Sequence, residues 1–147
     1  REGGAQLGEE TVKYLKPRAC YICKGRFREV HHFYDSLCPP CATLNFAKRT
    51  FTADLSDHIV LLTGGRIKIG FHCGLKLLRA GARVVVTTRF PCDAAARYGR
   101  EPDAAEWTSR LQIYGLDLRN LPAVEGFCAM LQATEPYLSA IVNNAAQ

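Results

Sequence analysis

The feature that most constrains this chain is a glycine-rich turn that joins two β-branched apolar runs. Residues 58–70 read HIVLLTGGRIKIG, and residues 82–86 read ARVVV. The segment between them, 69–80, places apolar residues at helical spacing. Strand, turn, helix and strand in this order make a βαβ unit, whose turn directs backbone N–H groups and a helix N-terminus toward a pyrophosphate. The segment therefore predicts a nucleotide-binding turn.

Two later segments carry related signals. Asp117 and Leu118 end an apolar run, and Asn-Asn-Ala-Ala at 143–146 follows the apolar run 140–142. Together with the glycine turn, these segments resemble the short-chain dehydrogenase/reductase family over about residues 55–147. A lone glycine motif is weak evidence, whereas three signals in the right order, each at the C-terminal end of a strand, are strong.

The motifs match that family closely, with two departures. The family's glycine motif reads T-G-x-x-x-G-x-G, and Thr63, Gly64 and Gly70 match it. Lys68 stands at the middle glycine position, and Ala146 replaces the glycine of the family's N-N-A-G. Lys68 could itself contact phosphate, and alanine is a small change from glycine, so the resemblance still implies a nicotinamide dinucleotide as ligand.

The resemblance also implies which residues contact that ligand. It places Gly64, Arg66, Lys68, Ile69 and Gly70 around the pyrophosphate, Asp117 and Leu118 at the adenine, and Asn143 and Ala145 at the nicotinamide-side ribose. The alternative is a vestigial turn that is retained for the fold alone.

The end of the second predicted strand indicates the choice of cofactor. An acidic residue there binds the ribose 2′-OH of NAD, whereas a nearby Arg accommodates the 2′-phosphate of NADP. This chain has Thr88 and then Arg89, with no carboxylate before Asp93. We therefore expect NADP to be preferred over NAD, with Arg89 stacked on the adenine or paired with the 2′-phosphate and Arg66 adding a second charge. The alternative is that Arg89 only begins a solvated loop.

The alternating elements predict an α/β fold with a parallel sheet and helices on both faces. The expected strands are 58–63, 82–88, 112–116 and 139–143, and the expected helices are 69–80, a segment near 103–110, and 119–133, with a loop after Phe90. By resemblance the strand order is 3-2-1-4, half of a doubly wound Rossmann-like sheet. The family's catalytic Ser and Tyr-x-x-x-Lys would lie beyond residue 147, so we expect this chain to bind a cofactor without catalysing a reaction.

Four cysteines before residue 50 have the spacing of a metal site. Cys20 and Cys23 form one C-x2-C pair, and Cys38 and Cys41 form a second after fourteen intervening residues. Zinc prefers four thiolates in a tetrahedron, so the spacing predicts one structural zinc ion that supplies most of the folding energy. His31 and His32 are spare ligand candidates. The alternative is a pair of disulfides or a set of buried thiols, but the chain has seven cysteines, an odd number that favours a reducing, intracellular compartment over disulfides.

The cysteine segment predicts a small separate module. A short hairpin over 27–34 and a helix over 42–49 would give a zinc-ribbon or treble-clef-like arrangement. We therefore divide the chain into a flexible lead-in, a zinc module and a Rossmann-like segment that stops after its fourth strand, at 1–12, 13–50 and 51–147. That fourth strand would leave an apolar edge, which the rest of the native protein, a partner chain or the zinc module would have to cover.

Charge distinguishes the module from the rest of the chain. Residues 13–49 carry eight Lys or Arg against two Asp or Glu, a net of +6, with aromatic residues interleaved. This pattern is compatible with a nucleic-acid surface, but we favour a solvated basic face whose aromatics fill a small core around the metal. Docking against the Rossmann-like segment or a protein partner is an equal use for the module.

Two hypotheses for function remain open. The first is the cofactor-binding part of a NAD(P)-dependent oxidoreductase with a structural zinc module, and the second is a non-catalytic protein- or nucleic-acid-binding zinc module on a degenerate Rossmann core. Lys68 and Ala146 favour the second slightly, because they alter the family motifs. No apolar run approaches the roughly 18 residues of a membrane helix, so we expect no membrane partner.

Overall fold

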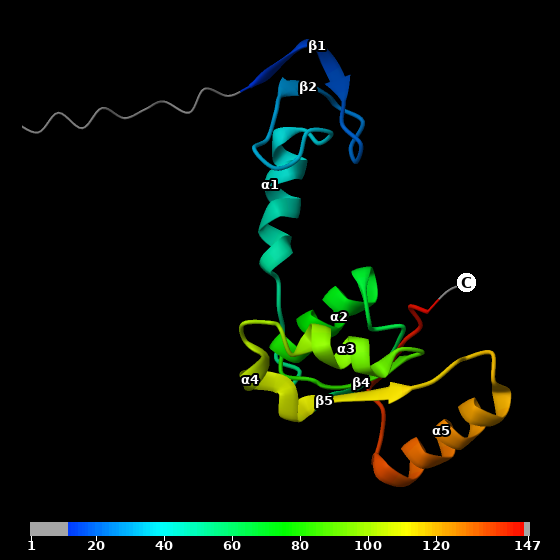
Figure 1. The fold of residues 1–147 in the computed structure, drawn as a ribbon. Helices are drawn as coiled ribbons and strands as arrows, with labels where there is room; N and C mark the ends of the chain where they lie inside the picture. Colours follow the sequence, from blue (N-terminus) through cyan, green and yellow to red (C-terminus); the bar gives the residue numbers. More distant parts are fainter. Residues whose placement is uncertain (1–11, 146–147) are drawn as a thin grey trace, which may run out of the picture. The chain divides into compact units, whose positions relative to one another are not determined.

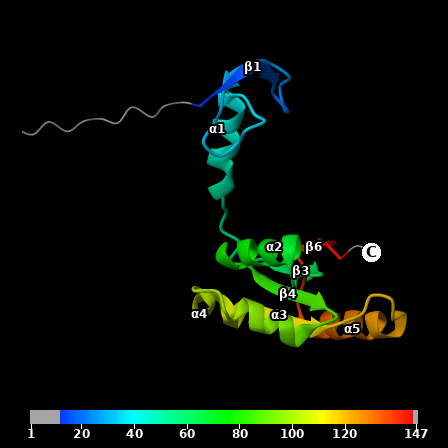
Figure 2. The same ribbon diagram turned by 45° about the horizontal axis from the view of Figure 1, so that its top comes forward.

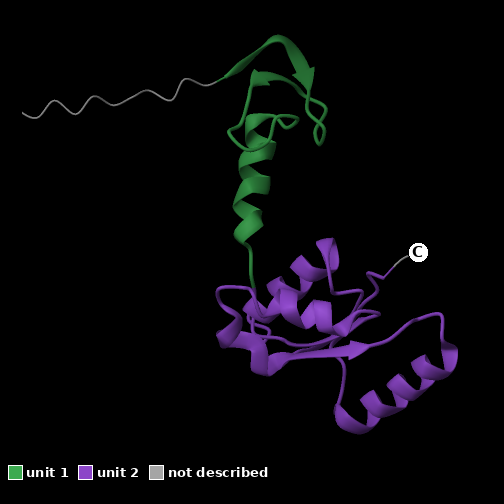
Figure 3. Cartoon of the chain, viewed as in Figure 1, with its two compact units in different colours: residues 1–52 green, residues 53–147 purple. Residues whose placement is uncertain are grey.

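A computed structural model describes residues 12–145, and the chain divides into two compact units, residues 1–52 and 53–147 (Figure 3). Most of the expected lead-in, 1–11, lies outside the described residues, as does Ala146. Most helices and strands are labelled in Figure 1, and β3 and β6 are labelled in Figure 2. Among the described residues, every helix is too short or too polar to serve as a membrane span.

The described part of the first unit begins with an antiparallel hairpin, β1 (Lys13–Ala19) and β2 (Arg26–Glu29). The first cysteine pair forms the turn of this hairpin, where the N–H of Cys20 donates to the carbonyl of Gly25 at 2.9 Å. Lys24 takes a left-handed conformation there, with φ of 62°. The expected hairpin over 27–34 is therefore wrong, because the strands flank the cysteine pair instead of following it.

The second cysteine pair lies at the start of a helix, α1 (Pro39–Ala47), which continues into η1 (Lys48–Thr50). The sequence predicts this helix over 42–49, but it begins three residues earlier, at Pro39. Proline suits the first helical turn, because its missing N–H has no intrahelical partner there and its φ is already helical. As a result Cys38 is the N-cap and Cys41 lies in the first turn.

The core of the first unit is small. Its buried members are Cys20, Phe27, Leu37 and Ala42, and Tyr14, Tyr34 and the second cysteine pair pack around them. A core of this size is too small to stabilise the unit by itself. Burial of so little apolar area contributes only a few kcal/mol, whereas ordering about 40 residues has a much larger cost in conformational entropy. The cysteine cluster is therefore the main candidate for what holds the unit together.

The second unit is built on a four-stranded parallel sheet with the order β5-β4-β3-β6. The strands are β3 (Ile59–Thr63), β4 (Arg83–Thr88), β5 (Leu111–Gly115) and β6 (Ala140–Val142). In chain order this is 3-2-1-4, which confirms the predicted fold class and strand order. Within residues 12–145, β6 pairs with β3 alone, and Ile141 on it is 56% exposed. That a partner covers this edge stays a prediction.

Helices connect the strands, and one of them was not expected. α2 (Lys68–Arg79) and α5 (Leu121–Thr134) lie near the predicted positions, and the expected helix near 103–110 is the short α4 (Ala104–Trp107) with η2 (Thr108–Arg110). The expected loop after Phe90 is wrong, because α3 (Pro91–Tyr98) begins there. Pro91 occupies the first helical position, where a proline starts a helix and does not interrupt it.

The helices cover both faces of the sheet (Figures 1 and 2). α2, α3 and α4 share one face, where their side chains form a nine-residue core with alternate residues of the two central strands: Val60, Leu62, Leu75, Leu78, Ala82, Val84, Val86, Tyr98 and Trp107. Tyr114 lies beside Ile113 on β5 and faces the other way, because successive strand residues alternate. Its ring contacts Phe127 of α5 with centroids 5.4 Å apart, so α5 lies on the opposite face.

Candidate functional site

A cleft of about 560 Å³ lies at the carboxyl ends of the parallel strands. Every lining residue comes from a segment that follows or ends one of the four strands: Gly64, Arg66, Ile67, Lys68, Ile69, Gly70, Thr87, Thr88, Arg89, Phe90, Leu116, Asp117, Leu118, Arg119, Asn144 and Ala145. Ligands of open α/β sheets bind in this crevice, where the direction of strand order reverses. Here that point lies beside β3, from which β4 and β6 extend to opposite sides.

The glycine turn has the shape that a bound phosphate needs. Gly64 has φ of +68°, and a side chain there would meet Ala145 at 3.1 Å. At Gly70, a Cβ atom would lie 2.3 Å from the carbonyl oxygen of Gly64 and 2.4 Å from Nδ2 of Asn144. Both positions therefore exclude larger residues. The two glycines let the first turn of α2 approach the turn closely, so the free N–H groups of the helix face the cleft.

The turn is braced by the segment after β6. The backbone N–H groups of Asn144 and Ala145 both donate to Oγ1 of Thr63, each at 3.1 Å. The side-chain amide of Asn144 donates to the carbonyl oxygens of Thr63 at 3.2 Å and Gly64 at 3.1 Å. Thr63 and Asn144 therefore hold the loop after β3 against the loop after β6, which sets the width of the cleft at this end.

A second brace comes from α3. The phenol of Tyr98, which is 1% exposed, donates to the carbonyl oxygen of Gly65 at 2.9 Å. Gly74 makes room for it, since a Cβ atom there would lie 2.2 Å from the phenol oxygen. Burial raises the pKa of Tyr98 well above its usual range, so the phenol stays a donor at neutral pH. A side chain from the buried core therefore holds the glycine turn in place through the carbonyl of Gly65.

Lys68 opens α2 with an unusual backbone conformation. Its φ is 51°, in the left-handed region that favours glycine. This is the position where the glycine motif of the resembling family has its middle glycine, so the backbone keeps the motif's shape although the residue differs. The Lys68 side chain is exposed at the cleft, next to Ile69, which is 79% exposed. A positive charge therefore stands at the N-terminus of the helix.

Two arginines at the cleft differ in their partners. Arg66 donates to Asp93 on α3 at 2.7 Å, and hydrogen bonds from Arg97 and Arg66 hold the pKa of Asp93 below its usual range. Arg89 has no ion pair within the described part of the chain, and its guanidinium carbon lies 5.7 Å from the centre of the Phe90 ring. Arg89 is therefore the free cation beside β4, while the charge of Arg66 is already partly neutralised.

The far end of the cleft contains an ion pair. Asp117 accepts hydrogen bonds from Nη2 of Arg119 at 2.6 Å and from its Nε at 3.0 Å. Hydrogen bonds from Arg119 lower the pKa of Asp117 to about 2, so its carboxylate is ionised at neutral pH. Leu118 remains 41% exposed and Phe90 52% exposed at the cleft. Both side chains line the cleft and offer apolar surface to a ligand.

Ten of the eleven residues that the sequence predicted for this site line the one cleft, although their roles stay predictions. The exception is Asn143, which is exposed and does not line it, whereas its neighbour Asn144 does. Sequence reasoning missed Phe90, Arg119 and the brace from Tyr98. The Asn-Asn motif was a signal for Asn144, but nothing in the sequence connects Tyr98 with the glycine turn.

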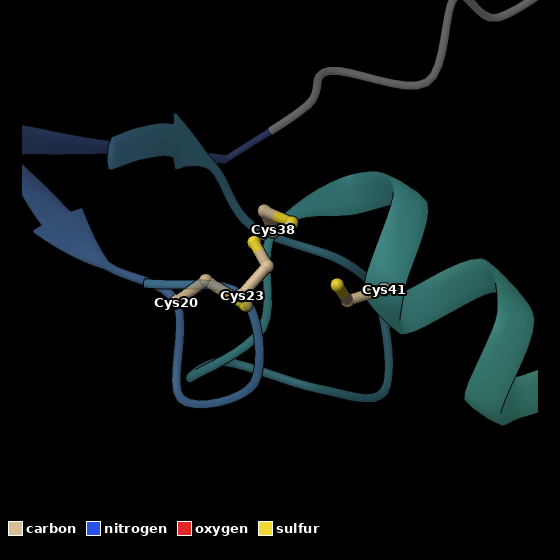
Figure 4. A group of neighbouring side chains, drawn as sticks. All are labelled: Cys20, Cys23, Cys38 and Cys41. Carbon is tan, nitrogen blue, oxygen red and sulfur yellow. Dashed lines mark hydrogen bonds between the residues drawn. The ribbon is translucent and has the colours of Figure 1, made fainter. Parts of the chain in front are cut away.

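The four predicted metal ligands lie together in the first unit (Figure 4). The Sγ atoms of Cys20, Cys23, Cys38 and Cys41 all lie within 4.8 Å of one another. Those of Cys23 and Cys38 are 3.6 Å apart, too far for a disulfide. A zinc ion with Zn–S bonds of about 2.3 Å would hold tetrahedral sulfurs about 3.8 Å apart, so the cluster has the size of such a sphere.

The protons of these thiols are strongly coupled. Burial would raise the pKa of the Cys20 thiol, but the backbone N–H groups of Cys38, Cys23 and Ile22 outweigh it and lower that pKa to about 6. The Cys38 side chain and burial raise the pKa of Cys41 to about 12. Without a cation, one ionised thiolate therefore makes ionisation of its neighbours unfavourable, because like charges repel at this distance. A divalent metal would offset that repulsion.

The two histidines of the loop 30–38 have other contacts. Nδ1 of His31 accepts from the N–H groups of Phe33 at 3.1 Å and Tyr34 at 3.4 Å. The rings of His31 and His32 lie 4.1 Å apart and pack near Phe46. Neither histidine belongs to the group of described residues that could hold a metal, and both rings pack against aromatic side chains instead.

Comparison with known proteins gives one relative that covers most of the chain and others that cover about three fifths of it. No protein-family model matches the chain. An uncharacterized protein of Acanthamoeba polyphaga mimivirus is 39% identical over 143 residues, covering 93% of this chain and 30% of that protein. The WW domain-containing oxidoreductase of Danio rerio is 32% identical over 94 residues, 63% of this chain and 22% of that protein. Retinol dehydrogenase 14 of Mus musculus is 34% identical over 97 residues, 58% of this chain and 28% of that protein.

Solved structures agree with these relatives. The RhlG protein of Pseudomonas aeruginosa, solved as an NADP active-site complex, matches with a TM-score of 0.55 and 29% identity over 64% of this chain and 35% of that chain. A short-chain dehydrogenase of Bacillus anthracis matches with a TM-score of 0.50 and 22% identity over 62% of this chain and 35% of that chain, which shows the fold alone. The chain spans about a third or less of the length of these proteins. Its second unit is therefore a partial Rossmann-like fold of the kind found in short-chain dehydrogenases, with members of that family among its relatives.

Proposed function

We propose that this chain is the cofactor-binding part of a NAD(P)(H)-dependent oxidoreductase of the short-chain dehydrogenase type, and that its four-cysteine unit holds a structural zinc ion. The observation that carries the proposal is the cleft itself. One contiguous cavity of about 560 Å³ joins the glycine turn, the residues after β4 and the residues after β5. These three places hold the pyrophosphate, the adenosine ribose and the adenine when a dinucleotide lies across a sheet of this topology.

The residues after β4 favour NADP as the cofactor. Arg89 lines the cleft without an ion-pair partner among the described residues, so its planar fork is free to bind a 2′-phosphate. Thr88 is 7% exposed, and its hydroxyl accepts the N–H of Phe90 at 3.2 Å, so the end of β4 offers the ribose hydroxyls no carboxylate at this position. The RhlG structure, similar at 29% identity, contains NADP, which supports the same choice here.

Titration calorimetry with NADP and with NAD tests this proposal. We expect saturable binding of both, with NADP tighter. Replacing Arg89 by Ala should weaken NADP binding by about 10- to 100-fold, the value of a charge-assisted hydrogen bond, and should change NAD binding little. The matched control is Arg100→Ala, an exposed arginine that does not line the cleft. Equal losses for both cofactors, or tighter binding of NAD by the unmodified chain, would disprove the choice of NADP.

The zinc proposal rests on the geometry of the cluster. Four cysteines close a tetrahedral sphere, whereas a catalytic zinc keeps one position for water or substrate. We therefore assign the metal a structural role. A non-catalytic protein is the second candidate function, and Lys68 at the middle glycine position is the observation that favours it. Absence of saturable dinucleotide binding, in protein that carries about one zinc per chain, would favour that second candidate.

A further inference from the structure

Positive charge is concentrated in the first unit. Residues 13–49 carry eight basic against two acidic side chains, whereas residues 50–147 carry ten against nine. Among the described residues, only Lys13 of those eight forms an ion pair, with Glu29 at 3.8 Å. Four thiolates and one Zn²⁺ would lower the net charge of this unit from +6 to about +4. The unit therefore presents cations with few internal counterions, which favours a polyanionic partner.

Exposed aromatic rings accompany these charges. The sequence suggested that the aromatics fill the core, and this holds for Phe27 but not for Phe33, which is 50% exposed, or Phe46, which is 38% exposed. The rings of Phe33 and Phe46 lie 5.5 Å apart, and His32 packs on Phe46 at 4.7 Å. We call His32, Phe33 and Phe46 the aromatic platform. Its members come from the loop 30–38 and from α1, so the fold holds the rings in place.

A cation lies over an exposed ring in two places on this unit. The guanidinium carbon of Arg49 is 4.3 Å from the centre of the Phe33 ring. At the first cysteine pair, Nζ of Lys24 is 5.0 Å from the centre of the Tyr21 ring, which is 76% exposed. Rings that accept flat aromatic groups, next to cations that accept phosphates, are the two parts of a surface that binds unpaired nucleotides.

We propose that the four-cysteine unit binds single-stranded nucleic acid, with bases stacked on the aromatic platform and phosphates held by Arg49 and the neighbouring basic side chains. The strand must be single, because a base in a duplex is stacked on its neighbours and its face cannot reach Phe33. Stacking tolerates any base, so the unit should distinguish strandedness more strongly than sequence. This binding is independent of the dinucleotide cleft, which lies in the other unit.

Fluorescence anisotropy with the zinc-loaded chain tests the proposal. The probes are labelled oligo(U) and oligo(dT) of about 12 nucleotides and a duplex of equal length, a span suited to small single-strand sites. We expect the single strands to bind more tightly than the duplex. Phe33→Ala should weaken single-strand binding by about 5- to 100-fold, the effect of losing one stacked base. Arg49→Gln should lower the slope of log affinity against log salt by about 0.7, the value of one phosphate contact.

Matched variants separate the platform from general charge and from folding. Leu44→Ala removes an apolar side chain that is 58% exposed on α1 but lies outside the platform, and Arg100→Gln removes an exposed cation in the other unit. Both should bind like the parent chain. Phe33→Trp should keep or strengthen binding, and every variant must carry about one zinc. Equal affinity for the duplex, no effect of Phe33→Ala at full zinc content, or binding to anionic vesicles but not to oligonucleotides would overturn the proposal.

Discussion

The two units of this chain reach stability by different means. The first has four buried residues in its core, and its two cysteine pairs lie directly after β1 and at the start of α1. The second has nine buried residues between one sheet face and three helices, including Trp107 and Tyr98. Buried apolar area is enough to order the second unit, but in the first it must be supplemented by a cross-link such as a metal. The first unit should therefore unfold when its metal is removed, and the second when its apolar core is disrupted.

Metal removal should have the largest effect, and only on the first unit. A strong chelator, or Cys38→Ser, should remove the zinc and abolish the folded amide NMR signals of residues 13–50, because structural zinc in such small units contributes about 10–16 kcal/mol. Emission from Trp107, the one tryptophan of the chain, should not change, since it is buried in the second unit. Cys128→Ser, at an exposed cysteine outside the cluster, is the control and should keep its zinc. Loss of the Trp107 signal with the metal would contradict independent stabilisation.

The converse change should damage the second unit alone. Leu78 is fully buried between α2 and the sheet, so Leu78→Ala should lower the free energy of unfolding by about 2–5 kcal/mol through lost contacts and a cavity. Denaturant titration followed by Trp107 emission measures this loss, and zinc content should stay at about one per chain. Leu44→Ala, at an exposed position of the first unit, should change stability by less than about 0.5 kcal/mol.

The hydrogen bond from Tyr98 to the glycine turn should have a smaller effect. Tyr98→Phe leaves the carbonyl of Gly65 without this donor, which should cost about 1–2 kcal/mol. Because burial raises the pKa of Tyr98, folding is favoured below the unfolded pKa of about 10 and loses that contribution as pH rises above it. The stability difference between pH 7 and pH 11 should therefore be smaller in Tyr98→Phe than in the parent. The control is Tyr137→Phe at a 52% exposed tyrosine, which should lose less stability at pH 7 than Tyr98→Phe.

Prolines explain most of what the sequence failed to predict. The pattern of strands and the order 3-2-1-4 were recognised, because β-branched runs alternate with one clear amphipathic helix. The starts of α1 and α3 were not, because the helix was expected only after Cys41 and Pro91 suggested a loop, although proline is favoured at the first helical position. In the first unit, the turn of the hairpin contains Lys24 with a positive φ, and a lysine in the sequence does not indicate such a conformation.

The error at α3 also hid part of the candidate site. Tyr98 and Asp93 both lie on that helix, so neither the brace on Gly65 nor the ion pair with Arg66 could be inferred from a loop. The residues that line the cleft were easier to identify, because each follows a strand that the pattern shows. Positions along the chain were thus predictable, while contacts between side chains far apart in sequence required the packed structure.

The last and smallest effect concerns Lys68, where stability and binding should move in opposite directions. Lys68→Gly removes a left-handed strain of about 1–2 kcal/mol, and the greater freedom of glycine in the unfolded chain offsets about 0.5–1 kcal/mol of it. We therefore expect the second unit to gain about 0.5–1 kcal/mol in stability by denaturant titration.

If Lys68 contacts the pyrophosphate, the same variant should bind NADP several-fold more weakly, because it loses a cation at the helix N-terminus. The control is Lys76→Gly on the exposed side of α2, where φ is helical and glycine should cost about 1 kcal/mol without changing NADP binding. A more stable Lys68→Gly chain with unchanged affinity would show that this lysine is only tolerated at a glycine position and takes no part in binding.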